Sequence, residues 1–102
     1  MKRGRRRRGK FGRIPQPVYI NHSPPTRTFK PEPASYGKPI YIEPAELEAI
    51  RLTDVENLSQ EEAGERMGVS RGTVWRLLQS GRTKIAQALV EGRLIEIREH
   101  PE

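Results

Sequence analysis

The chain has 102 residues, of which only 33% are hydrophobic, so it can bury one modest core and we expect a single small domain. A formal net charge of +6 favours a polyanionic partner, while the absence of cysteine excludes disulfides and thiolate chemistry. No apolar run approaches the roughly 20 residues that span a bilayer, and none follows the basic start, so we expect a cytoplasmic, nucleoid-associated protein without membrane contact.

Residues 1–13 form a basic tail that contains eight Lys or Arg and no acid. Few apolar residues are present to offset the entropy of ordering, so the tail is predicted to be disordered. Its charge predicts that it follows the phosphates of DNA or enters a minor groove, with Arg5, Arg6, Arg7 and Arg8 as the candidate contacts. RNA binding, a solubility tail and a nuclear localisation signal are open alternatives.

Residues 14–37 read as a proline-rich extended arm. Residues 1–40 have a net charge of +10 and hold seven of the nine prolines, whereas residues 41–102 have a net charge of −4. Proline lacks a backbone donor and biases its predecessor away from helix, so the arm is predicted to be mostly irregular. Phe29 and Tyr36 are the candidates to hold it against the domain.

Residues 38–102 are predicted to form the folded domain. Residues 39–43 are prone to form a strand, and a helix is expected from Pro44 to Glu56 because proline suits a first helical position. Acids in the opening turn match the helix dipole. The expected apolar face of this helix consists of Leu47, Ile50, Leu52 and Val55.

A second helix is expected over residues 60–67. Ser59 and Glu62 have the spacing of a capping box, in which each side chain accepts a hydrogen bond from the other residue's amide. Gly68 ends the helix because glycine readily adopts the left-handed conformation of a tight turn.

A third helix, capped by Ser70, is expected over residues 71–90, with Gly92 as its stop. Residues 93–98 are a second strand candidate, which pairs either with Ile40–Ile42 or with another copy of the chain. The predicted buried stripe of the third helix consists of Val74, Leu77, Leu78, Gly81, Ile85, Ala88 and Leu89.

Residues 58–78 have the spacing of a helix-turn-helix. Such a motif needs small residues in its first helix, a glycine at the turn, an apolar plug after it and an apolar inner face on its second helix. The residues that meet these needs are Ala63, Gly64, Gly68, Val69, Met67, Val74 and Leu77. We therefore predict a mainly α, tri-helical helix-turn-helix fold with one or two short β-strands; the alternative use is a helical packing unit without DNA contact.

The outer side of the third helix carries residues suited to DNA. No acid occurs from Val69 through Val90. Arginine pairs bidentately with guanine and glutamine with adenine, glycine permits close backbone approach, and a helix start attracts phosphate. The predicted DNA contacts of this helix are Ser70, Arg71, Gly72, Thr73, Trp75, Arg76, Gln79 and Arg82, and Lys84 extends the basic stretch.

The segments "ELEAIRL", "LSQEEAGERMGVSRGT" and "ALVEGR" resemble an uncharacterised family of small prokaryotic proteins predicted to bind DNA. The helix-turn-helix of that family is similar to region 4 of bacterial sigma factors, which reads the −35 promoter element. The resemblance implies a sigma-like tri-helical fold and a role in transcription, with no known target or ligand. The family tends to have a polar residue, often glutamine, where this chain has Trp75.

Other classes of function are less well supported by the residues. His22 and His100 lie far from any ordered cluster, and no catalytic or metal-ligand spacing is present, so we expect no enzyme, cofactor or metal. Glu61, Glu62 and Glu65 are typical of a solvated helix face.

The main alternative to DNA binding is a protein-interaction module that binds RNA polymerase or a sigma factor through Trp75. A homodimer, formed through the free edges of the two strands, is a further expectation because symmetry doubles base contacts.

Overall fold

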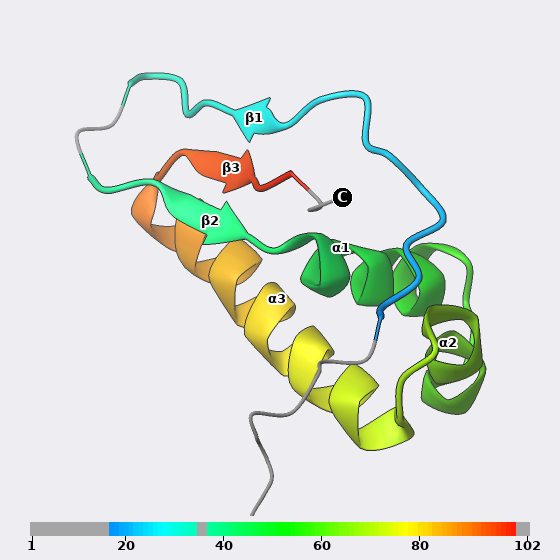
Figure 1. Cartoon of the computed structure of the whole chain (residues 1–102). Helices are drawn as coiled ribbons and strands as arrows, with labels where there is room; N and C mark the ends of the chain where they lie inside the picture. The colour runs from blue at the N-terminus through cyan, green and yellow to red at the C-terminus, as the bar shows by residue number, and fades with distance from the viewer. Residues whose placement is uncertain (1–16, 35–36, 100–102) are drawn as a thin grey trace, which may run out of the picture.

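A computed structural model describes residues 17–34 and 37–99 (Figure 1). The predicted basic tail with Arg5 to Arg8, the start of the arm, Tyr36 and His100 lie outside the described residues. The fold is mainly α with short strands, as predicted. Its long helix α3, Arg71–Glu91, is covered by a sheet near its C-terminal end, crossed by α1 at its middle, and packed against α2 near its start (Figure 1).

The first helical segment departs from the prediction. Helix α1 covers Pro44–Ile50, and a π-helical segment η1, Arg51–Val55, continues it. The amide of Glu56 donates to the carbonyl of Arg51 at 2.9 Å, five residues back. This wider turn rotates the following residues away from the α-helical register. The expectation of a buried Val55 was therefore wrong: its exposed fraction is 68%, whereas Leu52 is fully buried.

The prediction for the second helix is confirmed. Helix α2 covers Gln60–Met67, and its capping box is complete, because the Ser59 amide donates to Glu62 at 2.9 Å and the Glu62 amide donates to Ser59 Oγ at 3.0 Å. Gly68 follows with a left-handed φ of 72°. The helix boundaries are thus determined by local hydrogen bonds and one turn residue.

Helix α3 begins after Ser70 and ends at Gly92, which has φ 66°. One core cluster lies between its first half and α1, η1 and α2, and consists of Ala49, Leu52, Ala63, Met67, Val74 and Leu78. The predicted burial of Leu89 was wrong, since 75% of it is exposed. Each helical residue turns by about 100°, so while Ala88 faces the sheet, Leu89 turns to solvent.

The sheet has the order β1-β3-β2. Strand β3, Ile95–Ile97, pairs in parallel with β2, Ile40–Ile42, which confirms the expected pairing, and antiparallel with β1, Thr28–Phe29. Strand β3 is therefore central, and the prediction that its edge is free for a second copy was wrong. Ile40, Ile42, Ala88 and Ile97 form the second core cluster.

Residues 17–34, called the strap below, run past α2 and α1 before reaching the sheet (Figure 1). The strap is mostly irregular, as predicted, but it supplies β1. The Ile97 amide donates to the Arg27 carbonyl at 2.7 Å. Phe29 does not hold the strap in the way expected, because 52% of it is exposed. Backbone hydrogen bonds hold the strap at this end.

Two carboxylates of α1 are buried: Glu46 is 4% exposed and Glu48 is 2% exposed. Lys84 Nζ donates to Glu46 at 3.0 Å, and Arg51 donates twice to Glu48 at 2.9 Å. Burial raises the pKa of each carboxyl group, but the hydrogen bonds to the ionised form more than offset burial, so both pKa values lie below the usual 4.5. Both groups are therefore charged and paired at neutral pH.

The protein is expected to lose stability in acid because of these two groups. A carboxyl whose pKa is lowered by folding stabilises the native state above its unfolded pKa of about 4.5, and this stabilisation disappears as pH falls through the lower, folded value. Urea unfolding from pH 7 downward should show it, with a shallower pH dependence in Glu48→Gln. Equal pH dependence in both proteins would contradict the assignment to Glu48.

Candidate nucleic-acid interface

The start of α3 is held by its cap. Ser70 Oγ accepts a hydrogen bond from the Thr73 amide at 3.1 Å and lies 3.0 Å from Thr73 Oγ1. The Val74 amide donates to the Ser70 carbonyl at 3.0 Å. Among the described residues no acceptor is present for the amides of Arg71 and Gly72, so two donors at the positive end of the helix dipole are open to an anion.

Five predicted contact residues share one side of α3, here called the outer face: Arg71, Gly72, Trp75, Arg76 and Gln79. All five are exposed, and Trp75 is 52% exposed, as expected for a residue outside the core. Arg76 Nη2 donates to Thr73 Oγ1 at 3.3 Å, which holds its guanidinium beside the first turn. Within the described part of the chain, Arg71, Trp75 and Gln79 make no side-chain hydrogen bond or ion pair, so they are available to a ligand.

Among the residues that the structure describes, none packs closely against Gly72. A Cβ atom built there would lie 3.8 Å from Arg76 Nη1 and 3.9 Å from Ser70 Oγ, which are ordinary contacts. At Gly64, by contrast, a Cβ would lie 2.7 Å from the Val69 carbonyl oxygen, so that glycine is needed for the approach of the turn to α2. Glycine in a helix is destabilising by roughly 0.5–1 kcal/mol relative to alanine. Contacts among the described residues therefore do not require glycine at position 72.

The structure does not bring Arg82 together with the outer face. Arg82 makes a two-point contact with Asp54 of η1, with Nη2 at 2.7 Å from Oδ1 and Nε at 3.1 Å from Oδ2. Hydrogen bonding and charge from Arg82 lower the pKa of Asp54. Lys84 is also paired with an acid, through a single contact of Nζ with Glu46 Oε1 at 3.0 Å. The basic charge of α3 that lacks an acidic partner among the described residues thus comes from Arg71 and Arg76.

A hollow of about 710 Å³, which sequence reasoning did not predict, lies beside the start of α3. Glu61 and Glu65 line it from α2, opposite Ser70, Arg71 and Thr73. The four-residue spacing of Glu61 and Glu65 could have predicted that both lie on the same side of α2. Both carboxylates are exposed, as expected for a solvated face, but they border the outer face, where a carboxylate can accept a hydrogen bond from a cytosine amino group.

Two further properties concern the described residues alone. Within residues 17–34 and 37–99, no cluster of three or more His, Asp or Glu has the arrangement of a metal site. No helix in this part of the chain has the length and apolar character needed to cross a membrane.

Comparison with known proteins identifies the family. The family described as "Protein of unknown function DUF134" matches residues 1–100. A UPF0251 protein of Thermococcus kodakarensis is 54% identical over 83 residues, covering 81% of this chain and 68% of the relative. A UPF0251 protein of Archaeoglobus fulgidus is 47% identical over 92 residues, covering 89% of this chain and 88% of the relative.

A UPF0251 protein of Pyrococcus furiosus is 50% identical over 94 residues, covering 89% of this chain and 80% of the relative. No solved structure matches the chain significantly. The predicted resemblance to an uncharacterised prokaryotic family is thereby confirmed. The chain belongs to the DUF134 (UPF0251) family of prokaryotic proteins, whose function is unknown.

Proposed function

We propose that this protein binds duplex DNA in a sequence-specific manner and regulates transcription at the nucleoid, with the first half of α3 in the major groove. The observation that carries the proposal is the outer face itself: two arginines and a bare glycine on a helix start that its cap holds rigid. A helix about 10–12 Å in diameter fits a major groove about 12 Å wide.

The residues of this face have distinct roles in the proposal. Arg71 and Arg76 donate bidentately to guanine, and Gln79 pairs with adenine. The free amides of Arg71 and Gly72 bind a backbone phosphate, which fixes the register of the helix on the duplex. The basic residues Arg5 to Arg8 add affinity that is independent of sequence and falls with salt.

The ion pairs along α3 limit the part of the helix that can contact bases. Asp54 and Glu46 neutralise Arg82 and Lys84, so the second half of the helix adds little attraction for phosphate. The proposal therefore assigns base contacts to residues 71–79, about two and a half turns of helix. This length corresponds to a site of only a few base pairs for each copy of the chain.

In vitro selection from random duplex DNA, at a stated salt concentration, tests the proposal directly. We expect one enriched motif that the whole chain binds at least about a thousandfold more tightly than random DNA. Retention of the library without enrichment of any motif would refute sequence-specific reading and leave only charge-driven binding.

A second candidate function rests on Trp75. A tryptophan that is half exposed beside two arginines has the composition of a protein-interface anchor. In this alternative, the outer face binds RNA polymerase or a sigma factor. Nuclease treatment before affinity purification distinguishes this function from DNA binding. Polymerase or a sigma factor should co-purify after the treatment only if it contacts the protein directly.

Trp75→Ala is expected to leave the fold intact, since 52% of the side chain is already exposed. If the outer face binds DNA, the variant should bind its selected motif several-fold more weakly. It should retain the same amount of polymerase as the parent does. Thermal unfolding provides the control for the fold. A variant that binds the motif normally but loses a nuclease-resistant partner would favour the protein-interaction function instead.

A further inference from the structure

Two hollows lie between the strap, α1 and the sheet (Figure 1). The polar hollow has a volume of about 580 Å³, and its lining includes Asn21, His22, Ser23, Arg27 and Glu99. The apolar hollow has a volume of about 630 Å³, and its lining includes Pro25, Phe29, Ile50 and Val55. Both hollows are lined by His22 and Pro24 of the strap, Leu47 of α1 and Ile97 of β3, so they adjoin each other. Each volume is in the range of small-molecule sites.

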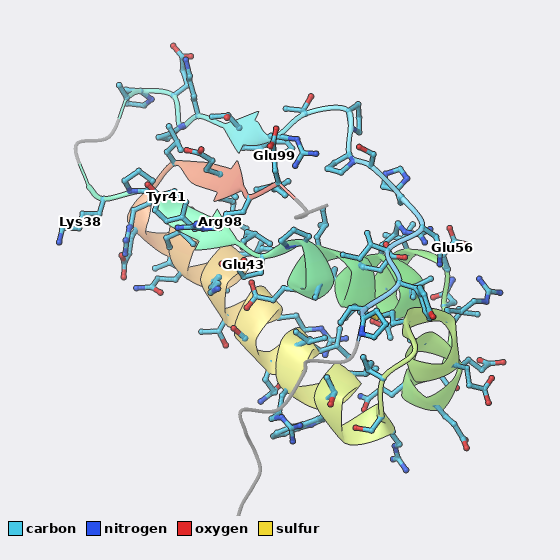
Figure 2. All side chains as sticks on the ribbon, viewed as in Figure 1. Lys38, Tyr41, Glu43, Glu56, Arg98 and Glu99 are labelled. Atoms are coloured by element: carbon cyan, nitrogen blue, oxygen red, sulfur yellow. The ribbon has the colours of Figure 1, made fainter. Side chains whose placement is uncertain are left out.

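Arg27 gives the polar hollow a positive charge that lacks an acidic partner. Its Nη1 donates to the Arg98 carbonyl at 3.1 Å, which holds the guanidinium at the end of β3, and its other nitrogens have no acceptor among the described residues. Arg98 turns its own guanidinium to β2, where Cζ lies 4.8 Å from the centre of the Tyr41 ring and Nε lies 3.5 Å from Glu43 Oε2 (Figure 2). Arg27 is therefore the arginine of this hollow that is open to a carboxylate.

Glu99 gives the polar hollow a negative charge that is also unpaired. Within the described part of the chain its carboxylate has no hydrogen bond or ion pair, whereas Glu48, the other acid of this hollow, accepts from the Asn21 amide and twice from Arg51. The side chains of residues 21–23 likewise make no hydrogen bond to any described residue. One cation, one anion and several neutral polar groups are therefore available to a ligand.

The apolar hollow is bordered by two large side chains that the core does not use. Phe29 of β1 is half exposed, and Val55 is mostly exposed because the π-helical turn of η1 rotates it away from the core. Turns of this kind are frequent at functional sites. Arg51 and Glu56 also line this hollow, and they pair with each other at 3.4 Å. The apolar hollow thus suits an uncharged apolar group.

We propose that the two hollows together bind a small molecule with a carboxylate, an ammonium group and an apolar body, the chemistry of an α-amino acid with an apolar side chain. Arg27 binds the carboxylate, Glu99 binds the ammonium group, and the side chain enters the apolar hollow. A ligand with a single charge would leave the opposite charge of the polar hollow without a partner. The inference does not rest on the proposed function, because no residue of the outer face takes part.

The test uses the full chain, labelled with ¹⁵N, and titrations with L-leucine, L-methionine and L-phenylalanine followed by NMR. We expect saturable shifts of the amides of His22, Leu47 and Ile97, and none in the first half of α3. The amino acid that binds most tightly is then compared with its amide, with its analogue that lacks the amino group, and with L-alanine. Each of the three lacks one group that the site recognises, so each should bind at least about tenfold more weakly.

Two variants test the assignment of the charged groups. Arg27→Gln should remove the preference for the amino acid over its amide, and Glu99→Gln should remove the preference over the analogue that lacks the amino group. Each variant should keep the other preference, which a general loss of structure would not do. Thermal unfolding of both variants provides the control for the fold.

A third variant tests the apolar hollow. Val55→Asp places a charge at its edge and should weaken binding of the amino acid at least about tenfold, because the charge would be desolvated by the bound side chain. Val90→Asp is the matched control, since Val90 is an exposed valine of α3 that lines neither hollow. It should bind the amino acid as the parent does.

Three results would overturn the inference. The first is the absence of saturable shifts with all three amino acids up to about 10 mM, a concentration that detects even very weak binding. The second is an equal loss of affinity for the amino acid and its amide in Arg27→Gln. The third is equal affinity of Val55→Asp and Val90→Asp. None of these results affects the proposed function, which is tested with DNA alone.

Discussion

The double variant Arg71→Ala, Arg76→Ala is expected to lose most of its preference for the selected motif over unrelated DNA, while remaining folded. Each bidentate contact between arginine and guanine is worth about 1–3 kcal/mol of discrimination. The loss of two such contacts should therefore lower the specificity ratio by at least about 30-fold. Competition binding at constant salt measures it, because the salt-dependent contribution of the basic tail is common to both DNAs.

Arg82→Ala is the matched control, because it removes the same side chain from the same helix. Arg82 is paired with Asp54 and is half exposed, so its loss should lower the free energy of unfolding by only about 0.2–1 kcal/mol. The preference for the motif should not change. A loss of preference in Arg82→Ala equal to that of the double variant would show that general basicity, and not the outer face, determines binding.

Gly64→Ala is expected to have the largest effect on stability among the glycine substitutions in the two helices that meet at the turn. Its new Cβ would lie 2.7 Å from the Val69 carbonyl oxygen, a backbone atom that cannot move aside cheaply. Overpacking of this kind costs about 1–3 kcal/mol or more, a large share of the roughly 5–15 kcal/mol that stabilises a small domain. The midpoint of urea unfolding should fall accordingly.

Gly72→Ala is the matched comparison, and it is expected to stabilise the protein where Gly64→Ala destabilises it. A Cβ meets nothing closer than 3.8 Å there, so alanine should raise the free energy of unfolding by up to about 1 kcal/mol through its helix propensity. If the backbone of α3 approaches DNA at this position, the same variant should bind the motif more weakly. A more stable protein that binds less DNA separates function from folding. Unchanged binding would exclude close approach at Gly72.

The caps and the turn could be predicted because they depend on residues that are close together in sequence. Ser59 and Glu62 form their capping box across three residues, and Gly68 adopts the conformation that a tight turn requires. Such interactions need no information about the rest of the chain. The positions of Arg71 and Trp75 outside the core followed from helical spacing in the same way.

Only the tertiary structure decided which of the basic residues of α3 are free. Arg82 lies 28 residues from Asp54 and Lys84 lies 38 residues from Glu46, so their pairing depends on how α1 and η1 cross α3. The hydrogen bond of Tyr19 to Met67 likewise joins segments that are distant in sequence. Helical periodicity predicts the direction of a side chain from its own helix, but a partner across the fold is chosen by packing. The sequence by itself thus determined the ends of α2 and the start of α3, together with the outer face, because these depend on neighbouring residues. Packing determined which basic residues of α3 are paired, because their acidic partners lie on other elements.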